Sequence, residues 1–598
     1  MQGSRATSTV VSAIQRRHRH QLHHIRKRSS AAAATTETIT PEAEVAECAY
    51  AKPYSELPGP TPIPILGNTW RLLPVIGQYD ISDLADVSHK LYRDYGKIVR
   101  LGGLVGRPDL LFVYDADEIE KVYRNEGATP FRPSMPCLVH YKSQIRKDFF
   151  GRLPGVVGVH GEPWREFRTK VQKPCLQIQT VKKYIEPIED VTNYFLTRMI
   201  EMRDSKDELP ADFDNEVHKW SLECIGRVAL DARLGCLDPN LPADSEPQKI
   251  IDAAKYALRN VAILELKFPF WRYIPARISP LWNRYVGNMD YFIEICMKHI
   301  NEAVDRLKTK SVVNENDLSL VERILASEPD PKTAYVLALD LILVGIDTIS
   351  MAVCSMLYQL ATRPEEQEKL YQEMVRILPR PDEKLTAAKL DQMHYLKAFI
   401  KEVLRVYSTV IGNGRTLQAD TVICGYKIPK GVIILPLTFL CSSFQVQLVF
   451  PTIVTGNMPD YVSQPDKFYP ERWMKQLDGG QENYIHPFAS LPYGHGPRMC
   501  LGRRFADLEM QVLLAKVSNQ QKLLVFISRE NIILFLFREI QLKNARADIL
   551  IRTRVAYDQF ALSRLSERCK FLRHENFGTS TTCSPELIRF RKLKSINA

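Results

Sequence analysis

Hydrophobic positions follow a helical period over most of the chain. From about residue 80, long segments repeat apolar residues every three or four positions and are interrupted by proline, as amphipathic helices are. Stretches typical of β-strands are short, such as LLFVYD at residues 110–115 and TVICGYKIPKGVIIL at residues 421–435. The pattern predicts a mainly α fold with minor β structure.

The longest apolar segment covers residues 335–360. It contains two acids, Asp340 and Asp347, whose charges argue against a membrane-spanning helix. We expect a buried central helix instead. Polar side chains inside such a helix, among them Asp347 and Thr348, are either hydrogen-bonded or functional.

Composition and charge narrow the class of protein. The 598 residues are 45% apolar and 25% charged, which suits a large core and excludes collagen-like and disordered chains. The net charge of +11 is concentrated at the ends: residues 1–36 carry seven Lys or Arg and no acid, and residues 517–598 carry fifteen against seven acids. Residues 37–516 have a net charge of −4, so no nucleic-acid groove is expected there. Twelve cysteines without a C-x-x-C pair argue against a zinc finger or a disulfide framework.

The amino-terminal segment has the composition of a targeting sequence. Residues 1–36 combine basic residues with many Ser, Thr and Ala, and their apolar residues share one side of a helix. This pattern is typical of a mitochondrial presequence, which we expect to be disordered. The alternative is a plain basic tail, which the four histidines within residues 18–24 favour. No amino-terminal membrane anchor is expected.

The segment LPYGHGPRMCLGRRFADLEM, residues 491–510, carries the most specific chemistry. Cys500 lies in a glycine-rich loop directly before a strongly helical run. Glycines allow a flat ligand to approach the backbone closely, and the positive end of the following helix favours a thiolate. Arg498 is two residues away and suits an anionic group of the same ligand. These are the requirements of a cysteine-ligated haem.

The segment resembles the cysteine-loop signature F-x-x-G-x-R-x-C-x-G of the cytochrome P450 haem-thiolate monooxygenases, with Tyr493 in place of the usual Phe. The resemblance covers about residues 50–516 and is closest to insect-type mitochondrial members. It implies the cytochrome P450 fold, a large helical haem domain with small β-sheets, over residues 37–516. It also implies haem b as cofactor, Cys500 as the axial ligand of the haem iron, and O2 as co-substrate.

Two further motifs resemble structural elements of the same family. KAFIKEVLRVYS places Glu402 and Arg405 three residues apart on one helix, and PERW follows at residues 470–473. An isolated pair of this spacing normally means only a solvated helix surface. Together the two segments resemble the E-x-x-R and P-E-R-x motifs. The resemblance implies that Glu402, Arg405 and Arg472 form a buried charge cluster that locks the cysteine loop.

The central apolar helix contains a segment similar to the family's oxygen-binding motif. The resemblance implies a local bulge in the helix and a proton relay through Asp347 and Thr348. Two positions depart from the motif, Val344 and Ile349. Since Val344 replaces a small residue, it narrows the space beside the iron and bears on the fit of the substrate.

Three other residues are implied to hold the haem propionates together with Arg498. In GEPWREFRTKV, Trp164 and Arg168 are four residues apart on a helix and resemble the W-x-x-x-R motif. Arg415, in GNGRTLQAD, matches a second propionate-binding position. Without the other motifs, each of these residues would be interpreted as an ordinary core or surface residue.

A basic patch is implied to receive the electron donor. Lys397 and Lys401 share a face of the Glu402 helix, and Arg503 and Arg504 follow Cys500 closely. The lysine pair resembles the docking lysines of the mitochondrial branch. It implies an adrenodoxin-type [2Fe-2S] ferredoxin with its reductase, electrons from NADPH, and a location at the matrix side of the inner mitochondrial membrane.

The substrate is readable only as a class. Val344, Val410 and Ile411 are the pocket candidates, and they predict a lipophilic small molecule, either sterol- or ecdysteroid-like or a xenobiotic. We expect peripheral membrane association. The apolar stretch at residues 268–274 is a candidate for membrane contact, with burial in the core as the alternative.

Two stretches do not fit the family pattern. Residues 442–457 look inserted, and residues 517–598 lack the turn residues of the family's carboxy-terminal hairpins. Our hypothesis is that residues 517–598, together with the inserted segment, come from an intron read-through or a frame error in the gene model. The abnormal tail keeps one alternative to a monooxygenase open, a catalytically defective haem-binding protein. A second alternative is a reductase-independent haem-thiolate isomerase, against which Asp347, Thr348 and the lysine pair argue.

Overall fold

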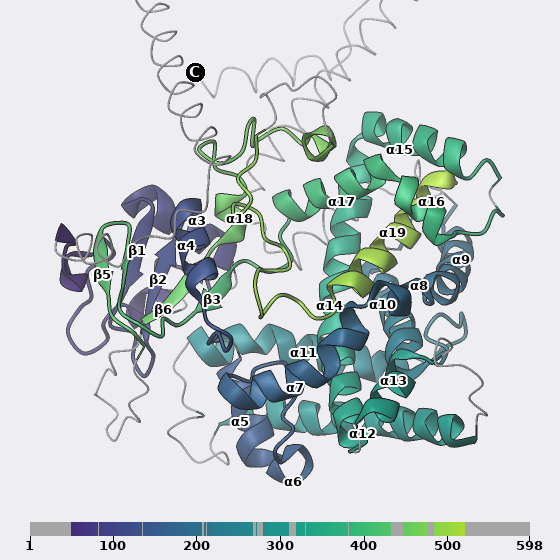
Figure 1. The fold of residues 1–598 in the computed structure, drawn as a ribbon, viewed down its shortest axis with the longest axis horizontal. Helices are drawn as coiled ribbons and strands as arrows, with labels where there is room; N and C mark the ends of the chain where they lie inside the picture. The colour runs from purple at the N-terminus through teal and green to yellow at the C-terminus, as the bar shows by residue number, and fades with distance from the viewer. Residues whose placement is uncertain are drawn as a thin grey trace, which may run out of the picture.

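The computed structural model describes residues 50–520 except 74, 82, 134, 206–208, 211, 267–270, 272–278, 310–317, 329, 381, 432–445 and 475–483. Both ends of the chain, including the predicted presequence at residues 1–36, lie outside the described residues. Most described residues are helical, and the strands gather at one side of the domain (Figure 1). The prediction of a mainly α fold with small sheets is confirmed.

The helices make up the larger part of the domain. In chain order they are α3 (Leu84–Tyr95), α4 (Ala116–Asn125), α5 (Pro136–His140), α6 (Lys147–Phe150), α7 (Gly161–Leu176), α8 (Ile178–Lys182), α9 (Ile185–Glu201), α10 (Phe213–Leu230), α11 (Glu246–Leu266), α12 (Pro280–Thr309), α13 (Leu320–Ser327), α14 (Lys332–Thr362), α15 (Pro364–Ile377), α16 (Ala387–Gln392), α17 (His394–Val406), α18 (Thr452–Thr455) and α19 (Arg503–Asn519). Short 3-10 turns add η1 (Tyr54–Glu56), η2 (Thr69–Leu72) and η7 (Pro470–Trp473), and η3 (Tyr141–Ile145) is a π-helical turn.

The main sheet has the strand order β1-β2-β6-β3. Its strands are β1 (Ile98–Leu101), β2 (Asp109–Val113), β6 (Val446–Phe450) and β3 (Asn413–Arg415). The β2–β6 pair is parallel, with Leu111 opposite Leu448, and the other two pairs are antiparallel. A second sheet consists of β4 (Thr421–Ile423) and β5 (Tyr426–Ile428).

The segment predicted to be an insertion, residues 442–457, contributes a strand to the sheet. Within it, β6 lies between two other strands with Leu448 fully buried, and α18 follows β6. A strand bonded on both sides cannot be removed without breaking the sheet. This part of the segment therefore belongs to the domain, and residues 442–445 lie outside the described residues.

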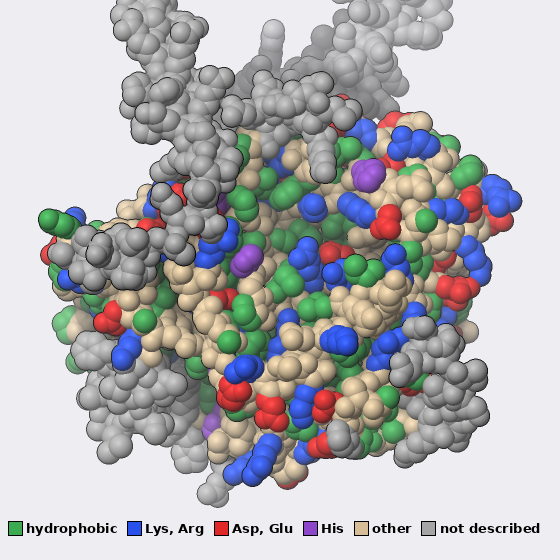
Figure 2. All heavy atoms as spheres, in the orientation of Figure 1, with side chains coloured by type: hydrophobic (Ala, Val, Ile, Leu, Met, Phe, Trp, Pro, Cys, Tyr) green, Lys and Arg blue, Asp and Glu red, His purple; other side chains and the backbone are tan. Residues whose placement is uncertain are grey.

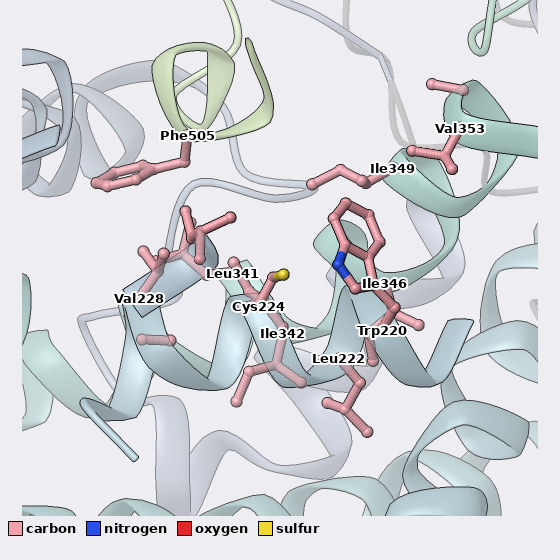
Figure 3. Packing of buried hydrophobic residues seen from close by; sticks show 14 of the residues in the cluster. Trp220, Leu222, Cys224, Val228, Leu341, Ile342, Ile346, Ile349, Val353 and Phe505 are labelled. Atoms are coloured by element: carbon pink, nitrogen blue, oxygen red, sulfur yellow. The ribbon is translucent and has the colours of Figure 1, made fainter. Parts of the chain in front are cut away.

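The long apolar segment forms α14, which is the core helix of the domain. Among the described residues it is the helix that is long and apolar enough for a membrane span, yet 72% of its most apolar window is buried in the protein. Its side chains Leu341, Ile342 and Ile346 pack with residues of α10 such as Trp220 and Cys224 (Figure 3). Each such aliphatic side chain contributes about 1.5–3 kcal/mol by burial.

The helix that follows the cysteine loop, α19, is buried along most of its length. It continues past Lys516 to Asn519, with Val517 fully buried. The domain therefore extends a few residues beyond the predicted boundary at residue 516. Residues 521–598 lie outside the described residues.

A carboxyl group without a hydrogen bond lies within α19. Glu509 is fully buried, and neither of its carboxyl oxygens has a hydrogen-bond partner among the described residues. Burial raises the pKa of Glu509 from 4.5 to about 8. Between these pH values the folded protein holds a proton that the unfolded chain has lost, so the free energy of unfolding falls as pH rises.

We therefore expect Glu509→Gln to flatten this pH dependence. Between pH 5 and pH 8 the variant should lose roughly 3–4 kcal/mol less stability than the wild type, because one pKa unit is worth about 1.4 kcal/mol. Urea unfolding at both pH values measures the difference. Glu166→Gln, at an exposed position of α7, is the control and should keep the wild-type slope. Equal slopes for wild type and Glu509→Gln would contradict the assignment.

Candidate active site

The cysteine loop is held in one conformation by its own backbone. Gly494 and Gly496 have φ of +69° and +73°, in the left-handed region where side chains are disfavoured. A Cβ at Gly496 would lie 2.5 Å from a carboxyl oxygen of Glu126. The N–H of Cys500 donates to the carbonyl of Tyr493 at 2.9 Å. These contacts fix where Cys500 points.

The surroundings of Cys500 act on its thiol in opposite directions. Burial raises the pKa of the Cys500 thiol, whereas the N–H of Gly502 and the charges of Arg132 and Arg168 lower it. The net shift is upward. A bound metal deprotonates a coordinating thiol outright.

Several arginines converge beside the cysteine. The guanidinium of Arg498 stacks over Trp164 at 4.2 Å and donates to the carbonyl of Val159 at 2.7 Å. Arg168, one turn after Trp164 on α7, donates to the carbonyl of Met499 at 2.9 Å. The structure thus brings together Trp164, Arg168, Arg498 and Cys500, as the motifs predict.

Two basic residues of this cluster were not predicted from the sequence. Arg132 interacts electrostatically with Cys500, Arg415 and Arg498. His160 precedes α7 and lies 3.4 Å from the guanidinium of Arg498. Burial and the neighbouring guanidinium groups lower the pKa of His160 to about 4. Neither residue belongs to a motif in the sequence. Only the position of His160, four residues before Trp164, could have indicated that it lies near this cluster.

Arg415 lies in the same cluster but already has a partner. Its guanidinium forms an ion pair with Glu126 at the end of α4, lies over the ring of Tyr123 and donates to the carbonyl of His495 at 3.5 Å. It therefore links α4, the β3 strand and the cysteine loop. Its predicted role in propionate binding stays a prediction.

The arginine cluster fits an anionic group of a haem. The Nη1 of Arg498 and the Nε of Arg168 are buried without a hydrogen-bond partner among the described residues. Burial, together with Arg132, Arg415 and Arg168, lowers the pKa of Arg498 to about 9. Unpaired buried guanidinium groups are costly, and carboxylates are their natural partners. Haem propionates would supply such carboxylates beside the sulfur of Cys500.

We expect Arg498→Gln to weaken haem retention. One lost charge-assisted hydrogen bond of about 1.5–3 kcal/mol corresponds to a roughly 10- to 100-fold weaker binding constant. The rate of haem transfer to an excess of apomyoglobin measures this loss. Arg124→Gln, an exposed residue of α4 paired with Glu120, should leave the rate unchanged. Retention equal to the wild type in Arg498→Gln would contradict the assignment.

The middle of α14 is its accessible part. Val344, Gly345, Asp347 and Thr348 are partly exposed, although the helix is buried on both sides of them. The hydroxyl of Thr348 donates to the carbonyl of Val344 at 2.7 Å. The backbone of α14 is α-helical throughout. The bulge that the resemblance implied is therefore absent from this helix.

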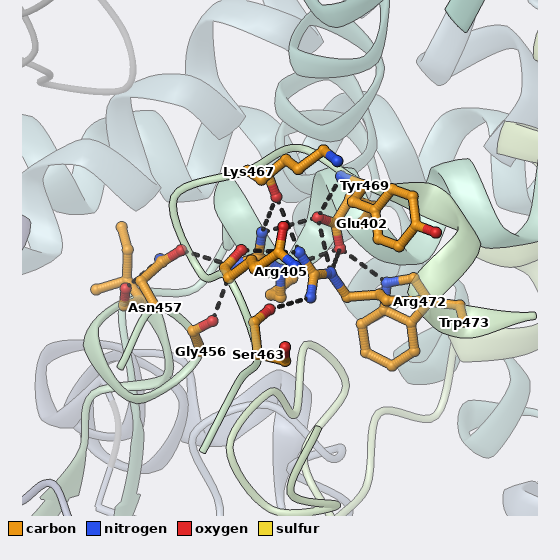
Figure 4. Close-up of polar contacts among 11 residues, drawn as sticks. Glu402, Arg405, Gly456, Asn457, Ser463, Lys467, Tyr469, Arg472 and Trp473 are labelled. Carbon is orange, nitrogen blue, oxygen red and sulfur yellow. Dashed lines mark hydrogen bonds and ion pairs between the residues drawn. The ribbon is translucent and has the colours of Figure 1, made fainter. Parts of the chain in front are cut away.

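The predicted charge cluster is present and buried. Figure 4 shows Glu402 between the guanidinium groups of Arg405 and Arg472, at 2.8–3.1 Å. The remaining acceptor positions of Glu402 receive the N–H of Tyr469 and the indole N–H of Trp473, both at 2.9 Å. Glu402 is fully buried.

The cluster acts on a different segment from the one predicted. Arg405 donates to the carbonyl of Gly456, and Arg472 donates to the carbonyls of Ser463 and Lys467. The cluster thus fastens α17 to residues 456–473. The cysteine loop is held by its own backbone bonds and by Arg168, so the predicted lock on that loop is indirect.

The predicted docking residues come together on one face. Lys397 and Arg504 line one surface pocket of about 210 Å³ between α8, α16, α17 and α19. Lys401 lies over the ring of Trp473 and interacts electrostatically with Asp507, as Arg503 does. Figure 2 shows basic side chains with a few acids on the face over α17 and α19. Lys397 is partly neutralised by Asp391 at 3.8 Å.

Tyr493 uses the hydroxyl that distinguishes it from phenylalanine. It donates to Asp507 of α19 at 2.6 Å, and the guanidinium of Arg503 lies over its ring. Burial and Asp507 raise the pKa of Tyr493. The substitution thus adds a tie between the loop and α19.

The substrate candidates are not all brought together. Val344 lies in the accessible part of α14. Val410 is 37% exposed, and Ile411 packs against the core cluster around α3 and α18. Their role in substrate binding stays a prediction. Trp271, from the predicted membrane-contact stretch, is buried against Trp282, which favours the core alternative for that residue; its neighbours 268–270 and 272–274 lie outside the described residues.

Fold and site together define a mostly helical domain with a cluster of arginines beside Cys500, an arrangement that fits an anionic planar ligand. The family model of cytochrome P450 matches residues 57–520. The chain is 65% identical to "Probable cytochrome P450 301a1, mitochondrial" of Drosophila melanogaster, over 79% of this chain and 83% of that protein. It is 45% identical to "Probable cytochrome P450 49a1" (82% and 81%) and 33% identical to "Probable cytochrome P450 12a5, mitochondrial" (82% and 90%), both of the same fly.

The chain belongs to the cytochrome P450 family. The protein is therefore an oxidoreductase of the monooxygenase type that uses haem b and O2. The resemblance inferred from the cysteine loop is confirmed.

Proposed function

We propose that the protein is a mitochondrial monooxygenase that inserts one oxygen atom from O2 into a lipophilic small molecule, with electrons from NADPH through a [2Fe-2S] ferredoxin and its reductase. The observation that carries the proposal is that Cys500 lies beside a cluster of buried arginines whose hydrogen-bond donors are not all paired. Bound there, the haem supplies the activation of O2.

The residues around the haem have separate roles in this proposal. The sulfur of Cys500 holds the iron, and Arg132, Arg168, Arg415 and Arg498 bind the propionates. The ring of Trp164 keeps water from the guanidinium of Arg498 by stacking on it. Excluding water strengthens these ionic contacts, because the local dielectric constant falls.

Asp347 and Thr348 are proposed to hold and move protons at the accessible stretch of α14. A carboxyl group and a hydroxyl next to each other there support a monooxygenase over a reductase-independent isomerase, which needs no proton delivery to oxygen. Val344 is proposed to limit the space for the substrate on the same stretch. A sterol- or ecdysteroid-like compound and a xenobiotic both satisfy the lipophilic requirement.

The electron donor is proposed to dock on Lys397, Lys401, Arg503 and Arg504. Lys397 and Arg504 line one surface pocket, and the positive charge of the four residues is complementary to an acidic ferredoxin. Two of the three relatives described above are named mitochondrial, and residues 1–36 have the composition of a presequence. We place the protein at the matrix side of the inner membrane on these grounds, with peripheral attachment.

Reconstitution tests the proposal. The haem-loaded protein is mixed with adrenodoxin-type ferredoxin, its reductase and NADPH, and lipophilic compounds are first screened for a shift of the haem absorption. Lys401→Glu combined with Arg504→Glu should raise the KM for ferredoxin at least about 10-fold, because like charges now face the acidic donor. Arg93→Glu, an exposed residue of α3, is the matched control and should not change it. An unchanged KM in the double variant would refute ferredoxin docking at this face.

A further inference from the structure

A histidine from a neighbouring helix contacts the predicted proton-relay carboxylate. His218 of α10 is 1% exposed, and its Nε2 lies 3.3 Å from Oδ1 of Asp347 on α14. Its Nδ1 lies 2.7 Å from the backbone carbonyl of Asp214. None of the motifs in the sequence includes His218, which is 129 residues from Asp347.

The two contacts fix the number of protons on the pair. A backbone carbonyl only accepts hydrogen bonds, so Nδ1 carries a hydrogen. A neutral imidazole then presents a bare lone pair at Nε2. Facing an ionised carboxylate, that lone pair makes no hydrogen bond and repels the oxygen. The contact with Asp347 therefore needs one more proton, either on Nε2 or on Oδ1.

We propose that His218 and Asp347 share one exchangeable proton and hold it beside Thr348, with His218 as the residue that positions and reloads Asp347. The inference rests on the proposed function for the role of Asp347 and Thr348. When the carboxyl gives up the proton, a bare Nε2 faces a carboxylate. This arrangement is unfavourable, so one proton returns from solvent for each one that leaves.

The charges around the pair favour this role. Asp214 carries its own counterion, since its carboxylate lies 3.5 Å from Nζ of Lys255 on α11. A further titratable group near Asp347 is the buried thiol of Cys354 on α14, whose pKa burial raises well above its ordinary value. The Cys354 thiol therefore does not compete for the proton near neutral pH.

The two side chains differ in exposure, which determines the end of the pair at which the proton exchanges. The side chain of His218 is 1% exposed, whereas that of Asp347 is 14% exposed and lies on the accessible stretch of α14. Exchange with that space therefore occurs at the carboxyl end of the pair. The adjacent Thr348 donates its hydrogen to Val344, which leaves its oxygen lone pairs free to accept.

Spectroscopy of the full-length, haem-loaded protein in its reduced, carbon monoxide-bound form tests the shared proton directly. Histidine is labelled with 15N, and infrared spectra are compared between wild type and Asp347→Asn. We expect either both nitrogens of His218 protonated, or a protonated-carboxyl stretch that Asp347→Asn removes. A His218 with bare Nε2 and no such carboxyl stretch would overturn the proposal. These measurements need no variant of His218 and no turnover.

The role of the proton is tested by His218→Gln, whose amide still donates to Asp347 but holds no exchangeable acid proton. Ferredoxin-driven O2 consumption should fall roughly 10-fold or more, as for other residues that orient a functional group, with a larger solvent deuterium effect. Ser350→Ala is the matched control, because it removes a contact from α14 to the carbonyl of Val217 on α10 without removing an acid.

The outcomes separate this inference from the proposed function. A wild-type protein that lacks the thiolate-type absorption of its carbon monoxide form would refute the proposed function, whatever the state of His218. If that absorption is present and His218→Gln keeps the wild-type rate and isotope effect, only the inference on His218 is overturned.

Discussion

Cys500→Ser should abolish the thiolate-type absorption of the reduced, carbon monoxide-bound protein and reduce O2-dependent turnover at least about 100-fold, since thiolate donation favours O–O cleavage. The protein should still fold, because the loop is held by backbone bonds such as that from Cys500 to Tyr493 rather than by the sulfur. Some haem should remain, since the arginine cluster is untouched. The spectrum, the haem content and the rate are measured on the same preparation.

A second cysteine provides the control for this substitution. Cys424 is a free, partly exposed cysteine between β4 and β5. Cys424→Ser should have the wild-type spectrum and rate. A thiolate-type band that survives in Cys500→Ser would mean that another residue ligates the iron.

Glu402→Gln should have the largest effect on stability. One carboxylate neutralises two buried guanidinium groups, Arg405 and Arg472, and also accepts two N–H groups. The amide has no charge and offers one acceptor oxygen fewer. Breaking a buried ionic contact from one side costs about 3–5 kcal/mol, which is a large part of the stability of a folded domain.

We expect Glu402→Gln to accumulate as haem-free, aggregated protein, because residues 456–473 lose their attachment to α17. Solubility, haem content and the melting temperature measure this effect. Glu471→Gln is the matched control: it lies in the same 3-10 turn and pairs with Lys369 at the surface. A soluble, haem-loaded Glu402→Gln with the wild-type melting temperature would show that the cluster is dispensable.

The helical period predicts the fold class and the central helix because each depends on local sequence. Motifs of the cysteine loop and the Glu402 helix were predictable for the same reason, since their residues lie within a few positions of one another. The place of residues 446–450 as an inner strand of the sheet could not be predicted, because the pairing of β6 with β2 joins positions more than 300 residues apart. Such a contact leaves no local pattern.

Partners from distant segments account for the rest of the site. Asp340 forms a buried ion pair with Lys142 at 2.6 Å and accepts hydrogen bonds from the N–H groups of Val156 and Val157. From the sequence, Asp340 argued only against a membrane-spanning helix. Arg415 pairs with Glu126, 289 residues away. No spacing in the sequence could show these pairs, and the same holds for His218 and Asp347.

The central claim is that the sulfur of Cys500 is bonded to haem iron. X-ray absorption at the iron edge of the purified wild-type protein tests it most directly, because it identifies the atoms bound to the metal. We expect one sulfur atom in addition to the porphyrin nitrogens, and its loss in Cys500→Ser. An iron coordinated only by nitrogen and oxygen in the wild type would contradict it.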